Sequence, residues 1–216
     1  MDFLLLFFVR ILEDSYIFNC IITTSDDCIA IKSGKNPEGN KIGKPTKNVF
    51  IAHCRFNGHG MSIGTEMSGG VSKITVRDCK IMKEDLNGLQ IKVPRERGGY
   101  VRNILVEDCT MSQIKIITKT SYNIGYEPAP EIPVIEDIKF VNLDISNAVN
   151  GKPAITIDGF EGFIENTANI RFNDILIADG TLVSLNNCSN ISFDNVRSVS
   201  AEKPVYQVKN TKNIKF

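Results

Sequence analysis

The sequence carries no excess charge, because its 25 Lys and Arg residues balance its 25 Asp and Glu residues. Nucleic-acid-binding proteins need a basic surface and interaction tails need a run of one charge, so the sequence supports neither class. No apolar run approaches the roughly 20 residues of a membrane-spanning helix. The most apolar segment, 1–12, also lacks the basic start and cleavage site of a signal peptide. We interpret it as a buried strand, or as a stretch that is not native to the fold.

Metal-binding cysteine motifs are also absent. The six cysteines include no CxxC pair, which argues against a zinc site, and nothing else in the sequence indicates a metal or a cofactor. An even number of cysteines in an exported chain is compatible with disulfides. Their positions favour another explanation, which depends on a repeat that runs through the chain.

A strand motif recurs along the sequence. Each copy has a polar residue, often Asn, then alternating apolar and polar residues, then Asp or Asn at a turn. The copies include KNVFIAHCRF, SKITVRDCKI, RNILVEDCTM, EDIKFVNLDI, ANIRFNDILI, SNISFDNVRS and TKNIKF. Their equivalent points are Asp14, Asn48, Lys73, Asn103, Asp137, Asn169, Asn190 and Asn213.

Steps of about twenty to thirty-five residues between short strands predict a β-solenoid, in which stacked coils bury a continuous apolar column. An antiparallel sandwich is the main rival, but it needs hairpin turns every 8–12 residues. Four cysteines occupy the same place in successive copies, so we expect a stacked interior ladder of reduced thiols made of Cys20, Cys54, Cys79 and Cys109. Asparagines at the turns are expected to stack in the same way.

Three stretches interrupt the repeat with polar groups. TTSDDCIAIKSG (23–34) holds the adjacent carboxylates Asp26 and Asp27, FNGHGMSIGTEMSGG (56–70) holds His59 between two glycines, and LNGLQIKVP (86–94) holds Gln90 and Lys92. Taken one at a time, these are more often a solvated turn, a structural histidine and an exposed strand face. Glycines beside His59 would let the backbone approach a ligand closely. His53 lies within a repeat, which indicates a structural role.

Together the three stretches point to one site. If 30–33, 62–64 and 89–92 are successive strands of one sheet, their polar groups line one groove. Paired carboxylates supply an acid and a base for glycoside hydrolysis, and a cation binds the carboxylate of an acidic sugar. An acidic polysaccharide is therefore the expected partner.

These strings are similar to the GDDCIAIKSG, GHGxSIGSE and RIK motifs of the polygalacturonases of glycoside hydrolase family 28. The similarity extends from about Ile17 to the C-terminus and is densest between Thr24 and Gly99. It implies a right-handed single-stranded parallel β-helix, as one domain over 1–216, that cleaves α-1,4 galacturonan with inversion. KIG at 41–43 and SGGV after the histidine motif resemble the bacterial branch.

The resemblance also implies a role for each site residue. Asp26 matches the general acid, Asp27 one of two aspartates that activate water, and His59 the histidine that maintains the protonation state of the acid. Lys92 matches the lysine that binds the substrate carboxylate. Tyr122 resembles a tyrosine near the same subsite. Gln90 stands where the family has an arginine, and it cannot form the bidentate Arg–carboxylate clamp.

Another departure concerns the beginning of the chain. The family's NTD motif, with the second water-activating aspartate, aligns with Leu5, and the nearest acidic residue, Asp2, is out of register. Family members also have coils and a cap before this point, so we expect an N-terminally truncated chain.

The alternative function is an impaired β-helix that only binds uronic-acid polymers. A calcium-dependent pectate lyase is a third interpretation. Family members are usually exported, to the periplasm or the medium, although no signal peptide is visible here.

Overall fold

The computed structural model describes residues 7–82, 88–118, 127–148 and 151–216. In this part of the chain nearly all regular structure is β, and every strand pairing is parallel. No described helix is both long enough and apolar enough to cross a membrane. The single α-helix among the described residues is α1, Glu38–Ile42, and two short 3-10 helices cover Arg95–Arg97 and Ile164–Asn166.

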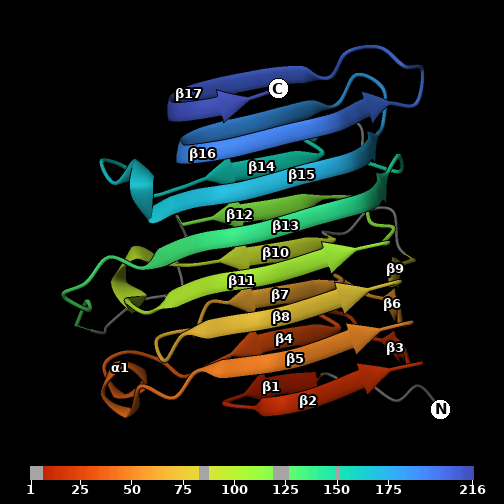
Figure 1. The fold of residues 1–216 in the computed structure, drawn as a ribbon. Helices are drawn as coiled ribbons and strands as arrows, with labels where there is room; N and C mark the ends of the chain where they lie inside the picture. The colour runs from red at the N-terminus through yellow and green to blue at the C-terminus, as the bar shows by residue number, and fades with distance from the viewer. Residues whose placement is uncertain (1–6, 83–87, 119–126, 149–150) are drawn as a thin grey trace.

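The strands form two facing layers that stack along one axis (Figure 1). The layer behind in this view consists mainly of short strands: β1 (Phe7–Arg10), β4 (Ile29–Lys32), β7 (Met61–Gly64), β10 (Leu89–Lys92), β12 (Ile114–Ile117) and β14 (Ile155–Asp158). The front layer consists of longer strands: β2 (Glu13–Phe18), β5 (Thr46–Ala52), β8 (Val71–Arg77), β11 (Tyr100–Glu107), β13 (Val134–Ile145) and β15 (Thr167–Ile177).

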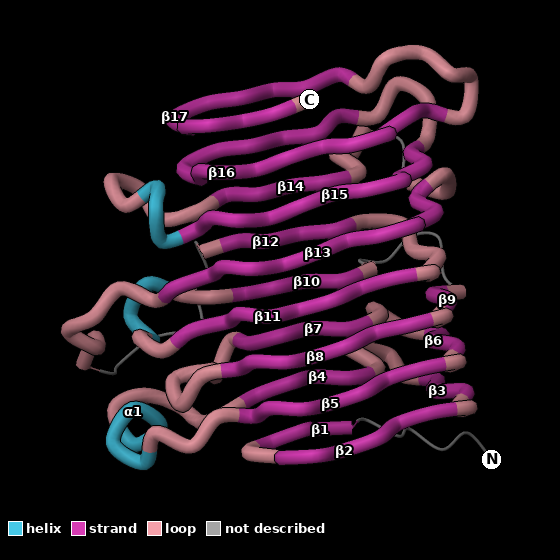
Figure 2. The backbone as a smooth tube through the Cα atoms, viewed as in Figure 1, coloured by secondary structure: helices cyan, strands magenta, loops and turns pink. Residues whose placement is uncertain are grey.

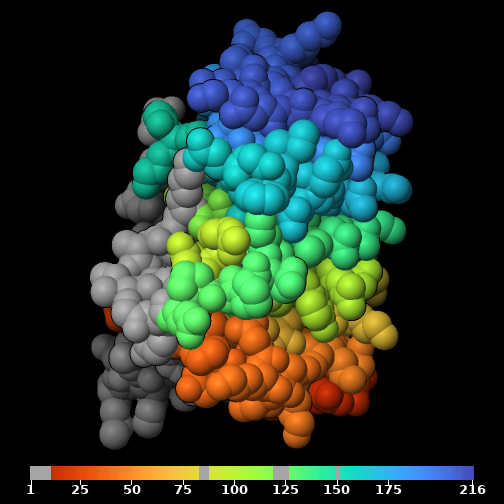
Figure 3. Space-filling view, turned by 90° about the vertical axis from the view of Figure 1, so that its left-hand side faces the viewer, coloured from red at the N-terminus to blue at the C-terminus, as the bar shows by residue number. Residues whose placement is uncertain are grey.

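The two layers belong to one folded sheet. Two long strands, β16 (Leu182–Ser198) and β17 (Val205–Lys215), run through both layers at the C-terminal end. A small side sheet contains β3 (Ile21–Thr23), β6 (Arg55–Asn57) and β9 (Lys80–Ile81). Figure 2 shows the successive coils as turns of one rising tube, and Figure 3 shows them from the side as bands in sequence order. The parallel β-helix that the repeat predicts is confirmed.

The register of the strands matches the predicted repeat. Val49 pairs with Ile74, Ile74 with Ile104, and Ile138 with Ile170, so equivalent residues of successive copies lie side by side. All of these side chains are buried. Because each coil buries its apolar side chains against the next coil, stacking supplies the core. Phe140, Phe172 and Phe193 form a stack with ring centroids 4.8 and 4.9 Å apart, which is the spacing of neighbouring strands.

Two rows of left-handed residues bend each coil. The equivalent points of the repeat, from Asp14 to Asn213, all have φ between 52° and 57°. A second row follows five residues later in each copy, as in His53 after Asn48 and Asp108 after Asn103. Asn and Asp tolerate this conformation better than other side chains, which explains why they dominate both rows.

The side chains of these rows also bond from coil to coil, as predicted for the turn asparagines. Asn48 donates to Asp14 at 2.9 Å, Asn213 donates to Asn190 at 2.9 Å, and Asn142 donates to Asp108 at 2.8 Å. Asp78 contacts the Nδ1 atom of His53 in the second row at 2.6 Å, and both side chains are exposed. The structural role predicted for His53 fits this contact.

The cysteine ladder lies inside the solenoid. Cys54, Cys79 and Cys109 are buried on three successive coils, and the backbone N–H of Cys79 donates to the Cys109 sulfur at 3.4 Å. Cys20 occupies the same position on β2's coil but is only partly buried. All six cysteines are free thiols. Burial raises the pKa of the Cys54 thiol to about 11 and that of Cys188 to about 12.

The beginning of the chain is only partly described. Residues 7–10 form β1, which pairs in parallel with β4, so this part of the apolar segment is a strand of the sheet. Leu5 aligns with the aspartate of the family's NTD motif, and Asp2 is the nearest acidic residue. Both lie outside the described residues.

Candidate active site

The candidate site lies on the outer side of the layer formed by β4, β7 and β10. These strands are neighbours in the sheet, as predicted: Ala30 pairs with Ser62, and Ser62 pairs with Gln90. Side chains alternate along each strand, so Ile63 and Ile91 enter the core while Ser62 and Gln90 lie on the other face. The predicted polar groups therefore gather over one stretch of sheet.

Asp26 and Asp27 lie in the bend that leads from β3 into β4. This bend directs both carboxylates to the same side, which a regular strand would not do. The carbonyl of Asp26 holds the bend, because it accepts hydrogen bonds from the Thr24 hydroxyl at 2.5 Å and from the backbone N–H of His59 at 2.9 Å. The backbone N–H of Asp27 donates to the Asp26 carboxylate at 2.8 Å.

Asp26 is the open acid of the pair. Its side chain is 72% exposed, and its Oδ1 atom lies 3.2 Å from the Nδ1 atom of His59, whose side chain is 34% exposed. The imidazole therefore faces the carboxylate and not the core. The Asp26 carboxyl group is therefore accessible to a bulky substrate, and His59 can exchange a proton with this carboxyl group.

Asp27 is the enclosed acid. Its side chain is only 15% exposed, and its Oδ2 atom accepts a hydrogen bond from the Ser62 hydroxyl at 2.6 Å. The Lys92 ammonium lies 3.4 Å from the same oxygen. One carboxylate oxygen is thus held by residues of two successive strands, β7 and β10, which fixes its position relative to Asp26.

The two carboxylates are close together. One oxygen of Asp26, one oxygen of Asp27 and one ring nitrogen of His59 lie within 4.8 Å of one another. This approach is closer than the about 6.5–9.5 Å between carboxyl groups that inversion calls for. The same three atoms also have the spacing of ligands to a divalent cation.

Two glycines of the histidine motif allow neighbouring segments to pack closely. A Cβ at Gly58 would lie 2.8 Å from the Asp26 carbonyl, so this glycine packs against the aspartate bend. The second case is Gly64, where φ is +101° and a Cβ would lie 1.9 Å from the Lys92 carbonyl. These glycines let the three motifs pack against one another. The close approach of a ligand at the glycines beside His59 stays a prediction.

Two groups near the site were not predicted from the sequence. Ser62, inside the histidine motif, donates a hydrogen bond to Asp27. The sequence could have indicated this role, because the strand position of Ser62 faces the same side of the sheet as Lys92. Glu66 pairs with Lys32, at the end of β4. Burial alone would raise the pKa of Glu66, but the hydrogen bond and charge of Lys32 outweigh it and lower the pKa below its usual range.

A buried arginine braces the loops that follow the motif strands. Arg97 is fully buried and donates to the Asn36 side chain at 2.7 Å and to the Thr65 carbonyl at 3.0 Å. It therefore connects the segments after β4, β7 and β10. Its burial was not predictable from its sequence context, in which it lies between charged and glycine residues.

The remaining predicted residues lie in two places. Gln90 is on the same strand and face as Lys92, is 8% exposed, and pairs in register with Ser62 and with Lys115. Tyr122 falls outside the described residues. The structure thus brings together Asp26, Asp27, His59 and Lys92, with Gln90 beside them.

The chain matches a known protein family along most of its length. The family model "Glycosyl hydrolases family 28" matches residues 12–215. A probable polygalacturonase of Vitis vinifera is 32% identical over 71% of this chain, and a polygalacturonase of Ralstonia solanacearum is 32% identical over 74% of it. The chain spans only 33% and 30% of the lengths of these two proteins.

Solved structures show the same fold. The family 28 exopolygalacturonase of Yersinia enterocolitica superimposes with a TM-score of 0.80, at 20% identity, over 96% of this chain and 37% of its own. An exopolygalacturonase of Thermotoga maritima gives a TM-score of 0.63 at 24% identity, over 96% of this chain and 43% of its own. The right-handed parallel β-helix is therefore shared with these enzymes. Because the family model matches residues 12–215, nearly the whole chain, the chain belongs to glycosyl hydrolase family 28.

Proposed function

We propose that this chain is a glycosidase that hydrolyses the α-1,4 galacturonosyl linkages of pectin-type polymers. The observation that carries the proposal is the convergence of an exposed acid beside a histidine, an enclosed carboxylate and a lysine on one sheet face. Membership of family 28 and the polygalacturonases among the relatives support the same substrate class.

In the proposed reaction, Asp26 in its protonated form donates its proton to the glycosidic oxygen as the bond from that oxygen to the anomeric carbon breaks. A water molecule adds to the anomeric carbon, and Asp27 accepts the proton that this water loses. Asp27 then releases this proton to solvent, and His59, 3.2 Å from Asp26, passes a proton from solvent to Asp26 for the next turnover. The stereochemistry is proposed to be inverting, and the anomer formed first, followed by proton NMR, tests this directly.

Lys92 is proposed to bind a uronic carboxylate of the substrate. Its ammonium lies 3.4 Å from Asp27 and is 18% exposed, so one carboxylate can approach it while the contact with Asp27 remains. Gln90 is proposed to donate a hydrogen bond to the same sugar, and Tyr122 to lie at the same subsite. Since the substrate is a polymer outside the cell, we propose a secreted or periplasmic site of action.

A reducing-sugar assay on polygalacturonate tests the proposal. Asp26→Asn should lower kcat by about 10²–10⁴-fold, because it removes the general acid, while binding of the polymer persists. Asp14→Asn is the matched control, since Asp14 is an exposed left-handed residue at which asparagine is equally suitable. Turnover that survives Asp26→Asn would exclude an enzyme at this site. Binding by the unmodified chain without any turnover would instead favour the impaired uronate-binding protein.

A further inference from the structure

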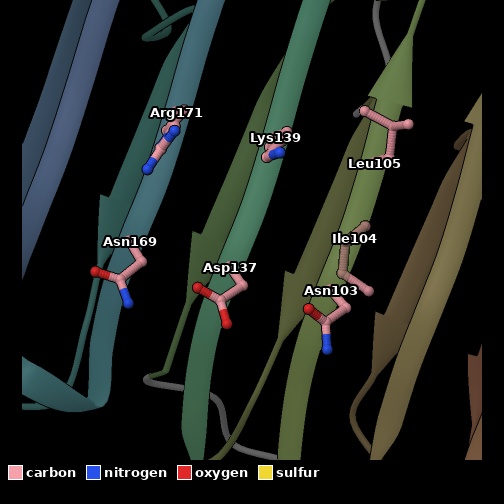
Figure 4. Close-up of a pocket in the computed structure, with 7 residues that line it drawn as sticks. All are labelled: Asn103, Ile104, Leu105, Asp137, Lys139, Asn169 and Arg171. Atoms are coloured by element: carbon pink, nitrogen blue, oxygen red, sulfur yellow. The ribbon is translucent and has the colours of Figure 1, made fainter.

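A second concave surface lies on the opposite layer, over β11, β13 and β15. Figure 4 shows its lining as two rows that cross the strands. One row contains Asn103, Asp137 and Asn169, and the other contains Leu105, Lys139 and Arg171. The hollow has a volume of about 570 Å³. Of the candidate active-site residues that the structure describes, none lines it.

The hollow continues towards the C-terminal coils. A neighbouring depression of about 850 Å³ shares Lys139, Asn169 and Arg171 with it and extends over β16 and β17. The register continues each row, because Arg171 pairs with Ser192 and Ser192 pairs with Lys215. We call the two depressions together the asparagine trough. It runs along the stacking axis and suits an extended chain better than a compact ligand.

Several cations elsewhere on this layer have a carboxylate partner. Elsewhere on the same layer, Arg77 pairs with Glu107, Arg102 with Glu136 and Lys47 with Glu13. In the trough, by contrast, Lys139 and Arg171 are exposed and adjacent, and within the described parts of the chain neither has an ion-pair partner. Two neighbouring cations that make no ion pair among the described residues favour an anionic ligand.

The rest of the lining narrows the ligand class. Lys139, Arg171 and Lys215 outnumber the two carboxylates, Asp137 and Asp194, and Asp194 accepts a hydrogen bond from Asn173 at 3.4 Å. The amides of Asn103, Asn169, Asn190 and Asn213 offer donors and acceptors in a row, which suits sugar hydroxyls. Among the residues that the structure describes, no aromatic side chain lines either depression, so these residues offer no stacking surface of the kind with which proteins hold single-stranded nucleic acid.

We infer that the asparagine trough is a second, non-catalytic binding site for a carboxylated polysaccharide. The choice of a uronic-acid polymer rests on the proposed function. Lys139 and Arg171 bind its carboxylates, and the asparagine row binds its hydroxyls. Such a site would hold the polymer on one layer while the other layer cleaves it, and so raise the local substrate concentration at the candidate active site.

Affinity electrophoresis in gels that contain polygalacturonate tests the inference without requiring turnover. Lys139→Gln/Arg171→Gln should weaken retention by roughly three- to thirtyfold, from two exposed charge contacts. Lys41→Gln/Lys203→Gln is the matched control, because it removes the same charge from exposed lysines outside the trough. The charge-retaining Lys139→Arg/Arg171→Lys should keep most of the retention. Equal loss in the control, or no loss in the trough variant, would overturn the inference.

Two further measurements separate the trough from the candidate active site and from other polyanions. Hydrolysis of a galacturonate trimer, which is too short to reach both layers, should be unchanged in the trough variant, and a parallel loss would overturn the inference. Fully methyl-esterified pectin, which lacks free carboxylates, should not be retained. The inference would also be overturned if the protein bound RNA as well as polygalacturonate and the trough variant lost both to the same extent. The trough would then be a general polyanion site. If the proposed hydrolysis fails, the retention result still stands by itself.

Discussion

The Ser62 hydroxyl on β7 donates a hydrogen bond to the Asp27 carboxylate in the bend before β4 at 2.6 Å, and the two residues are 35 apart in the sequence. This bond and the Lys92 ammonium hold the same oxygen of Asp27. The enclosed carboxylate is therefore positioned by its neighbours in the sheet, and its orientation depends on the register between β4, β7 and β10.

Replacing Ser62 should expose this dependence. We expect Ser62→Ala to lower kcat on polygalacturonate by about ten- to a hundredfold, because a hydrogen bond to a charged group is lost in the transition state. Ser184→Ala is the control, since Ser184 lies in the same outward row four strands away. Thermal unfolding of both variants should match the unmodified chain. An unchanged kcat in Ser62→Ala would show that Asp27 needs no such positioning.

Gln90 offers a test of substrate charge. Gln90→Arg should lower KM for polygalacturonate by roughly fivefold with little change in kcat, because a charged donor replaces a neutral one beside Lys92. The gain should shrink in high salt as screening increases. Gln90→Met, of similar length and without charge, should give no gain. Equal KM values for the two variants would mean that the residue at position 90 does not reach the substrate carboxylate.

Metal dependence distinguishes hydrolysis from calcium-assisted elimination. Asp26, Asp27 and His59 have ligand atoms within 4.8 Å of one another, so the site geometry alone would admit a cation. We expect a chelator to leave turnover unchanged and added calcium to have no effect, because the proposed acid and base need no metal. Loss of activity on chelation, with an unsaturated sugar among the products, would support a lyase.

The cysteine ladder makes a prediction about reactivity. Burial raises the pKa of Cys54 to about 11 and that of Cys188 to about 12, so near pH 8 these groups stay protonated, and the thiolate is the reactive form. A thiol reagent should modify partly buried Cys20 first and the five buried thiols only after denaturant is added. Cys20→Ser should abolish the fast phase. Rapid labelling of all six cysteines in the folded chain would mean that the ladder is open to solvent.

Much of the fold follows from the sequence because stacked coils repeat their chemistry. Asn48, Lys73 and Asn103 are recognisable as equivalent points without a structure, and all three have positive φ. The short helix α1 and the brace made by Arg97 were not predicted, because both belong to the segments between repeats, where no periodic signal exists. That residues 1–216 form one domain remains a prediction.

The site was predictable in composition but not in geometry. Asp26, Asp27, His59 and Lys92 meet as the motifs indicated. The sequence did not reveal that Lys92 would contact Asp27, or that Asp26 would be open while Asp27 is enclosed. Those features depend on the bend at 25–28 and on strand register, which arise from packing between segments 35 to 65 residues apart.

The two left-handed rows have a consequence for how such a chain can vary. Within each coil the rows stay five residues apart, from Asp14 and Asn19 to Asn190 and Asn195, although the contacts between successive coils span from 21 to 34 residues. The stretch between the two rows thus has a constant length, and the differences in length between successive coils fall outside it. Loops beside the short strands of the other layer can lengthen, shorten or be exchanged between relatives while the core stays in register. Substrate preference can therefore diverge among these proteins on a frame that does not change.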